Sequence, residues 1–437
     1  MANTKLTEKL TAIADAIREK TGKSEKMTLA EMPVEIGNIQ SGGGGSAARD
    51  YEVNDVTFYD YDGTIVYSCS MEDAQKLEKL PEPPGHKGLV FQEWNWTLEE
   101  IKSSSVGADV GALYDTEDGA LVFNIEVKNE IERKNIALKF IPITSSIQPP
   151  HLTVDWGDGS TETTADTVSS SGLVITHAYS QNGRYAIHVK KSAPDEEGFS
   201  ITCVDANSLQ LISDGSNIDN IIDSVYVGSD CDSLQNKLFA GVNAIRSLTV
   251  HKDLELPNTA PLFSQTGGAL RCLILPPNTA NLYGIITGCK TIIVISIPPW
   301  IVSCSLGKDH SCSRVIVPDT ASVLGSSSSC GSKIKELRIG KNVWKIDSYA
   351  FATDEKCISN VTIPASVKML NSSCFSGLKN IKEYHLLGET PPNLASAKSL
   401  ATVTGVTKIF VPKGTGDVYR AATNWAALAD YIIEEGK

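Results

Sequence analysis

The chain opens with apolar residues at the spacing of one helix face: Leu6, Leu10, Ile13 and Ile17. Steps of 4, 3 and 4 residues place them on one side of a helix that Gly22 would end. A helix of about sixteen residues is marginal by itself in water, so this seam must be buried. Two partners stay open: the apolar residues of 29–36 in the same chain, or the same seam in other copies. We therefore predict a helical attachment or oligomerisation segment over 1–40.

A run of glycines, Gly42–Gly45, then predicts a flexible Gly/Ser linker over 41–49. Residues 50–118 mix helical and strand periodicity, which predicts a small α+β unit. Its expected elements are two short strands, a helix, a longer strand and a second helix: Val56–Tyr59, Thr64–Tyr67, Met71–Leu80, Leu89–Trp96 and a helix capped by Thr97.

Residues 119–195 have the pattern of an all-β unit, because apolar residues alternate or run together between turn signals. The expected strands are Leu121–Val127, Ile136–Ile141, Leu152–Trp156 and Tyr185–Val189.

Between about 200 and 412, a short apolar strand recurs every 20–25 residues and is stopped by residues such as Pro276 or Gly340. The nine strands are Val225–Val227, Leu248–Val250, Leu273–Leu275, Ile295–Ile297, Val315–Val317, Leu337–Ile339, Val361–Ile363, His385–Leu387 and Ile409–Val411. A period of 20–29 residues with one strand per unit is typical of a leucine-rich solenoid. Its units would bury their apolar sides against their neighbours.

Residues 413–437 leave the repeat. Four apolar residues at helical spacing predict a C-terminal helical cap on the open end of the solenoid: Tyr419, Trp425, Leu428 and Ile432. The fold class expected for the whole chain is therefore mainly β and modular, with few helices.

Charge and composition exclude several classes of function. The chain has 39 Lys and Arg against 52 Asp and Glu, a net charge of −13, which argues against broad nucleic-acid binding and against a polybasic membrane anchor. We expect no spanning helix, because no run of 18 apolar residues occurs, and no secretion signal, because Asp15 interrupts the apolar stretch Leu10–Ile17. Ten cysteines without a CxxC pair predict buried free thiols.

Two segments of the chain resemble known families of binding modules. Ile346–Phe351 and Val361–Pro364 resemble the BspA-type leucine-rich repeat, which implies surface-exposed binding to proteins or glycans without catalytic residues. Val154–Ser160, His177–Tyr179 and Gly183–Ile187 resemble a PKD-type β-sandwich, which implies a spacer or adhesion module.

The N-terminal segment carries a third resemblance. Leu10–Arg18, with Lys20–Lys23 and Met27–Leu29, resembles the start of virion tail proteins from phages of Gram-positive gut bacteria. Two stretches of the unit that follows, Phe58–Thr64 and Glu93–Trp96, are similar to segments that recur in the same proteins. The resemblance implies a virion protein that attaches through its N-terminus.

Two groups of carboxylates could carry chemistry. Asp60-x-Asp62-Gly63-Thr64 after an apolar strand resembles the first motif of haloacid-dehalogenase-type phosphatases, which implies an aspartyl nucleophile, a general acid and Mg²⁺. The rest of that fold has no room before the β unit, so a hairpin turn is the favoured interpretation and we expect no enzyme. Asp155, Asp158 and Glu162 could gather around Ca²⁺, but capping of a tight turn suffices, so we expect no metal and no cofactor.

Aromatic residues supply the candidate binding positions. Trp94 and Trp96 alternate with Asn95 and are expected in the core, with a sugar-stacking platform as the alternative. Trp300 follows Pro298-Pro299, where a strand has ended and the chain must be near the surface. An exposed aromatic among loops is a suitable anchor, which gives three candidate receptor-binding residues on the irregular repeats 276–330: Tyr283, Trp300 and His310.

Together these features predict a non-enzymatic bacteriophage virion surface protein of the tail-fibre or tail-tip type, made in the host cytoplasm. Its N-terminus would bind other virion proteins and could form a homo-oligomer such as a trimer. Its solenoid would bind a bacterial surface protein or glycan, with no nucleic acid and no membrane insertion. A head fibre or capsid-decoration protein and a bacterial surface adhesin are the alternatives.

Overall fold

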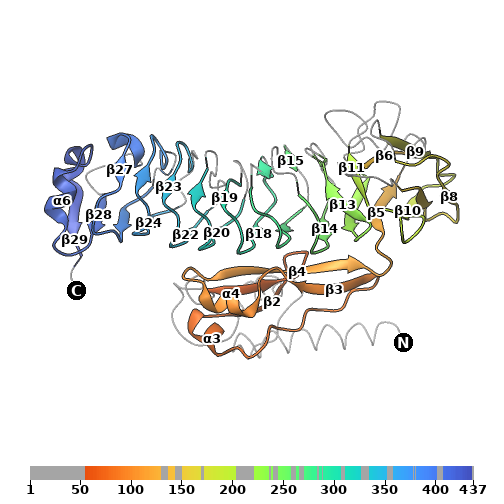
Figure 1. Cartoon of the computed structure of the whole chain (residues 1–437), viewed down its shortest axis with the longest axis horizontal. Coiled ribbons are helices and arrows are strands. Elements are labelled where there is room, and N and C mark those ends of the chain that lie inside the picture. The colour runs from red at the N-terminus through yellow and green to blue at the C-terminus, as the bar shows by residue number, and fades with distance from the viewer. Residues whose placement is uncertain are drawn as a thin grey trace, which may run out of the picture. The chain divides into compact units, whose positions relative to one another are not determined.

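Figure 1 shows the computed structural model of the 437-residue chain, which divides into two units, Met1–Glu52 and Val53–Lys437. The structure describes residues 55–435 with these gaps: 129–135, 143–149, 169–171, 203–220, 236–237, 240–244, 257–261, 265–269, 283–284, 288, 307–310, 326–333, 352–357, 377, 379 and 401–406. The seam Leu6–Ile17 and the glycine linker lie outside the described residues.

The second unit begins with an α+β segment of four strands and two short helices. These are β1 (Val56–Tyr59), β2 (Ile65–Cys69), α3 (Met71–Lys76), β3 (Leu89–Trp94), α4 (Leu98–Ser103) and β4 (Ala108–Thr116). The sheet order is β2-β1-β4-β3, with β1 and β4 parallel and the other neighbours antiparallel. Thr97 caps α4 as expected, since its side chain and that of Glu100 each accept the other residue's backbone N–H. The helix expected to reach Leu80 ends at Lys76.

The pattern along the chain did not predict β4, although nearly all of this strand is buried. Its alternate side chains serve two different cores. Val110, Ala112 and Tyr114 pack in the core of the α+β segment, whereas Leu113 belongs to the larger core of the rest of the unit. Gly111 lies so close to the solenoid that a Cβ there would be 2.3 Å from Cγ2 of Ile274. The absence of a side chain therefore allows β4 to approach the solenoid.

Two sheets follow, and their facing sides share a hydrophobic core. Their strands are β5 (Leu121–Val127), β6 (Ile136–Pro142), β7 (Leu152–Asp155), β8 (Thr161–Thr163), β9 (Leu173–His177), β10 (Gly183–Lys191), β11 (Phe199–Thr202), β12 (Ile222–Val227), β13 (Cys231–Leu234) and β14 (Ser247–Val250). The sheet orders are β14-β12-β5-β10-β7-β8 and β13-β11-β6-β9. The four strands predicted between 121 and 189 are all present.

The first two repeat strands of the solenoid belong to the six-stranded sheet. β12 pairs with β5 in the antiparallel sense on one side and with β14 in the parallel sense on the other. The hydrophobic core consequently continues from Phe123 and Trp156 into the solenoid without interruption. The two-sheet segment thus closes one end of the array.

The solenoid carries two parallel columns of strands. One column is β16 (Cys272–Ile274), β18 (Val294–Ser296), β20 (Arg314–Val317), β22 (Glu336–Ile339), β24 (Asn360–Ile363), β26 (Glu383–Leu386) and β28 (Lys408–Val411). The other is β15 (Phe263–Ser264), β17 (Ile286–Thr287), β19 (Ser303–Cys304), β21 (Val323–Leu324), β23 (Lys345–Ile346), β25 (Met369–Leu370) and β27 (Asn393–Leu394). The first column confirms the predicted repeat, whereas the second, of two-residue strands, was not predicted.

The C-terminal segment is not the continuous helix that its apolar spacing predicted. A six-residue helix, α6 (Gly416–Ala421), is followed by a 3₁₀ turn, η2 (Ala426–Tyr431), and then by strand β29 (Ile432–Glu434), which pairs with β28. Asn424, with a φ of 66°, lies in the left-handed region and breaks the helical path. A second 3₁₀ turn, η1 (Ala397–Ser399), precedes β28. The four apolar residues of the predicted cap are buried all the same.

The described cysteines confirm the expectation of free thiols. Seven are described, all are buried, and none forms a disulfide: Cys69, Cys231, Cys272, Cys289, Cys304, Cys312 and Cys374. Within the described residues, we find no helix whose length and apolar character would allow it to span a membrane.

Candidate functional site

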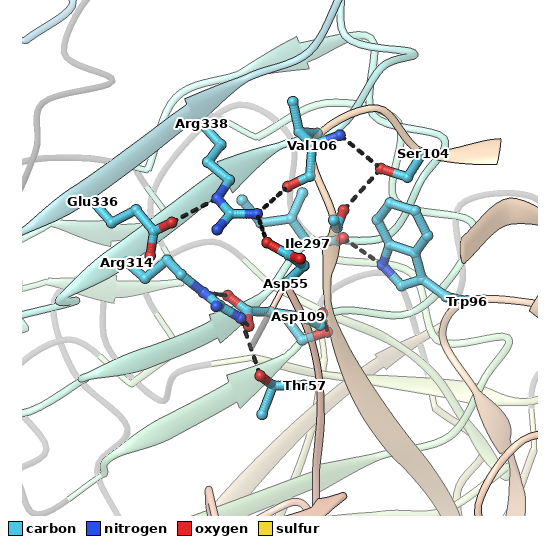
Figure 2. A network of polar contacts seen from close by, with 12 residues as sticks. Asp55, Thr57, Trp96, Ser104, Val106, Asp109, Ile297, Arg314, Glu336 and Arg338 are labelled. Atoms are coloured by element: carbon cyan, nitrogen blue, oxygen red, sulfur yellow. Dashed lines mark hydrogen bonds and ion pairs between the residues drawn. The ribbon is translucent and has the colours of Figure 1, made fainter. Parts of the chain in front are cut away.

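A buried ion pair fixes the α+β segment to the solenoid (Figure 2). Arg314 of β20 donates from Nε to Oδ2 of Asp109 at 3.2 Å, and its Nη2 pairs with Oδ1 of the same carboxylate. Nη2 also donates to Oγ1 of Thr57 at 3.2 Å. Burial alone would lower the pKa of Arg314, but the carboxylate of Asp109 outweighs it and raises that pKa.

A second arginine, Arg338 of β22, contacts both the beginning of the same segment and the loop between α4 and β4 (Figure 2). Its Nη1 donates to Oδ1 of Asp55 at 2.8 Å and to the carbonyl of Val106 at 3.1 Å. Its Nε donates to Oε1 of Glu336 at 2.6 Å. The segment is thereby tied at two places to adjacent turns of the solenoid.

The loop between α4 and β4 makes a further contact with the solenoid. The backbone N–H and Oγ of Ser105 donate to the carboxylate of Asp319 at 2.8 and 2.6 Å. Burial alone would raise the pKa of Asp319, but these bonds and those from Lys341 outweigh it and lower that pKa. Asp319 therefore stays a carboxylate between the two segments.

The residues that follow β3 bond to the solenoid. Asn95 donates from Nδ2 to the carbonyl of Leu275 and to Oγ of Ser296, both at 2.9 Å. Trp96 donates from Nε1 to the carbonyl of Ile297 at 2.8 Å. Trp94 and Trp96 are only 5% and 3% exposed, so the expected core role of both is confirmed.

Where the α+β segment meets the solenoid, two adjoining hollows open to solvent. One has a volume of about 520 Å³ and lies between the loop that contains Pro81, the β3–α4 turn and Pro277. The other, of about 260 Å³, lies between α4 and the turns that carry Thr320 and Asn342. Both are lined by Trp96, Glu100 and Trp300. We call the two hollows together the junction groove.

Trp300 stands where the two hollows meet, and its side chain is 60% exposed. The next residue, Ile301, is fully buried and anchors the turn. Of the three candidate receptor-binding residues, the structure places Trp300 on an exposed surface, as expected. Tyr283 and His310 lie outside the described residues.

The larger hollow has an acidic rim. Glu82, Glu93 and Glu100 line it, against one lysine, Lys79, whose ammonium lies 3.1 Å from Glu82. Sequence reasoning missed this rim, because Glu82 in a loop, Glu93 in β3 and Glu100 in α4 come together beside the solenoid only in the folded chain.

The two carboxylate motifs serve as turns. Asp60 accepts a hydrogen bond from the backbone N–H of Tyr61 and lies 2.7 Å from Nε2 of His86, while Asp62 accepts the N–H of Thr64 in the β1–β2 hairpin. Gly63 closes that hairpin with a φ of 89°.

The carboxylates at the end of β7 and after it also accept hydrogen bonds that close a turn. Asp155 accepts the N–H of Gly157, and Asp158 accepts the N–H and hydroxyl of Ser160 and contacts His177 at 2.8 Å. Burial would raise the pKa of Asp158, but these bonds outweigh it and lower that pKa to about 2. Within the described part of the chain, no group of three His, Cys, Asp or Glu side chains could hold a metal ion.

Comparison with known families identifies the solenoid. Residues 302–420 match the family model of the BspA type leucine rich repeat region, in six copies. Over these residues, the solenoid is a leucine-rich-repeat array of the BspA type. The match favours a surface-binding or adhesin-type protein. No curated protein matches the chain.

Proposed function

We propose that this chain is a non-enzymatic surface-binding protein carried on a bacteriophage virion, of the tail-fibre or tail-tip type. The observation that carries the binding role is the BspA-type solenoid, which is fixed to a second segment and presents an exposed tryptophan beside a groove. The virion role is supported by the resemblance of residues 10–29 to the start of phage tail proteins.

In this proposal, residues 1–40 attach the protein to other virion proteins, and the glycine linker lets the rest of the chain move. The two-sheet segment, which resembles a PKD-type sandwich, acts as a spacer. The solenoid binds a protein or glycan on the bacterial surface. Several copies on one particle would raise avidity without any new contact.

The test is immunogold labelling of particles and cells from a bacterial culture that carries the gene, with antibodies raised against residues 53–437. Gold at the tail, together with inhibition of adsorption by the purified chain, is the expected result. Gold on the capsid would support a head fibre or decoration protein instead. Gold on the cell wall with none on particles would overturn the virion role and support a bacterial surface adhesin, which the BspA-type match also favours.

A further inference from the structure

The walls of the junction groove are formed by regular elements of the fold. Its wall on the solenoid side is a column of equivalent positions on successive turns, because Ser303 pairs with Val323 and Val323 with Lys345. Three residues before each of these strand positions stand Trp300, Thr320 and Asn342. Helix α4 forms the opposite wall, so the groove runs along one corner of the array.

The indole of Trp300 is exposed on a stretch of backbone that its neighbours restrict. Two prolines precede it and restrict the backbone, and buried Ile301 follows it. A large aromatic side chain gains free energy by burial, so one that stays mostly exposed beside a formed groove can gain that free energy by packing against a ligand. The indole is therefore available to a ligand, and its backbone needs little further ordering on binding.

The other walls of the groove carry the polar groups of a ligand site. Glu100 is oriented by its hydrogen bond to the N–H of Thr97, and Glu93 forms no ion pair within the described part of the chain. A site of a few hundred cubic ångströms with apolar walls and a small number of oriented polar groups is typical of small-ligand binding.

Charge narrows the class of ligand. Three glutamates and a single lysine, itself paired with Glu82, leave the larger hollow acidic, and the whole chain has a net charge of −13. Anionic ligands are therefore repelled. A neutral sugar ring suits the remaining features, because its C–H face can pack on the indole while its hydroxyls donate to the carboxylates.

We propose that the junction groove binds an uncharged oligosaccharide, with one sugar ring stacked on Trp300 and its hydroxyls bonded to Glu93 and Glu100. The proposal rests on the surface-binding function and names its ligand class. It also places the ligand where the solenoid meets the α+β segment, so neither segment alone would bind the oligosaccharide.

The test applies the full chain and two variants, Trp300→Ala and Trp344→Ala, to a printed array of neutral and acidic glycans. Trp344 is the matched control, because it is a tryptophan of the same solenoid, 44% exposed, that does not line the groove. We expect neutral glycans to bind the wild type and Trp344→Ala equally. Trp300→Ala should bind them at least about tenfold more weakly, as when a contact residue is truncated at a binding hot spot.

Trp300→Phe retains an aromatic face and should recover part of the binding, which guards against a folding defect in Trp300→Ala. Binding of acidic glycans only, equal binding by Trp300→Ala, or no neutral glycan bound would each overturn the proposal. A choline titration covers the other ligand that an acidic aromatic groove could take. Trp300-dependent choline binding without glycan binding would show that the groove takes a cation, and it would also overturn the oligosaccharide proposal.

Cell binding separates this proposal from the function on which it rests. If wild type and Trp300→Ala bind bacterial cells equally and neither binds neutral glycans, the groove proposal fails and the surface-binding function stands. If the wild type binds neutral glycans through Trp300 but binds no bacterial cell, the surface-binding function fails and the groove proposal stands.

Discussion

Replacing Arg314 by methionine tests whether the α+β segment and the solenoid form one mechanical unit. The change removes the guanidinium and leaves the carboxylate of Asp109 buried, with its side chain 8% exposed. At 3.2 Å and an effective dielectric constant of about 20, the attraction between the two charges is worth about 5 kcal/mol before desolvation. Breaking a buried pair by removing one partner costs about 3–5 kcal/mol, so we expect a loss of that size in the free energy of unfolding.

The assay is urea unfolding followed by tryptophan fluorescence, since buried Trp94 and Trp96 lie beside the junction. With a slope of about 3 kcal/mol per molar urea, the midpoint should fall by about 1 M or more. Arg246→Met is the matched control, because Arg246 pairs with Asp223 at 2.9 Å on an exposed surface and should cost about 0–1 kcal/mol. Equal losses for the two variants would refute the conclusion that the Arg314 pair is desolvated.

Three further predictions follow from features described above. Asp158→Asn should destabilise the protein by roughly 1–2 kcal/mol at pH 7, because the folded-state pKa of about 2 lies below the ordinary value of 3.8. The stabilisation by ionised Asp158 is lost as the pH falls from about 4 to about 2, so the melting temperatures of variant and wild type should converge near pH 2. A difference in melting temperature that persists at pH 2 would contradict this prediction. Gly111→Ala should cost about 1–3 kcal/mol in urea unfolding, since its Cβ would overlap Ile274, and a neutral change would show that β4 can move away. If residues 1–40 assemble the protein, Leu10→Asp should lower the mass measured by light scattering to that of one 46.9 kDa chain. A wild type that is already monomeric would instead make residues 1–40 a docking peptide for another protein.

The solenoid was predictable from the sequence because each turn repeats one apolar strand and a stop residue. The second column of strands was not, because two residues such as Val323–Leu324 are too short to show a period. The strand β4 escaped detection for a different reason. Both of its faces are buried, in two separate cores. The strand therefore lacks the alternation of polar and apolar residues that marks a strand with one exposed face, and even Asp109 is buried.

The candidate site was predictable only in part. The exposure of Trp300 follows from the two prolines that end its strand, and this local reasoning was correct. The opposite wall comes from Glu93 and Glu100, about 200 residues earlier in the chain. Nothing local in either segment encodes their meeting, which depends on the contacts of Asp109 and Asn95 with the solenoid.

The position of the junction has a consequence for how such a protein can change over generations. The contacts that hold the α+β segment reach the turns from β12 to β22, and the turn just after β22 lines the smaller hollow with Lys341. The turns that follow repeat about every 24 residues and stack on one another through parallel pairing. Insertion or deletion of one such turn would move the C-terminal end by about 4.8 Å and leave the groove intact. Recombination within the array could therefore alter the length of the solenoid while the junction groove stays the same.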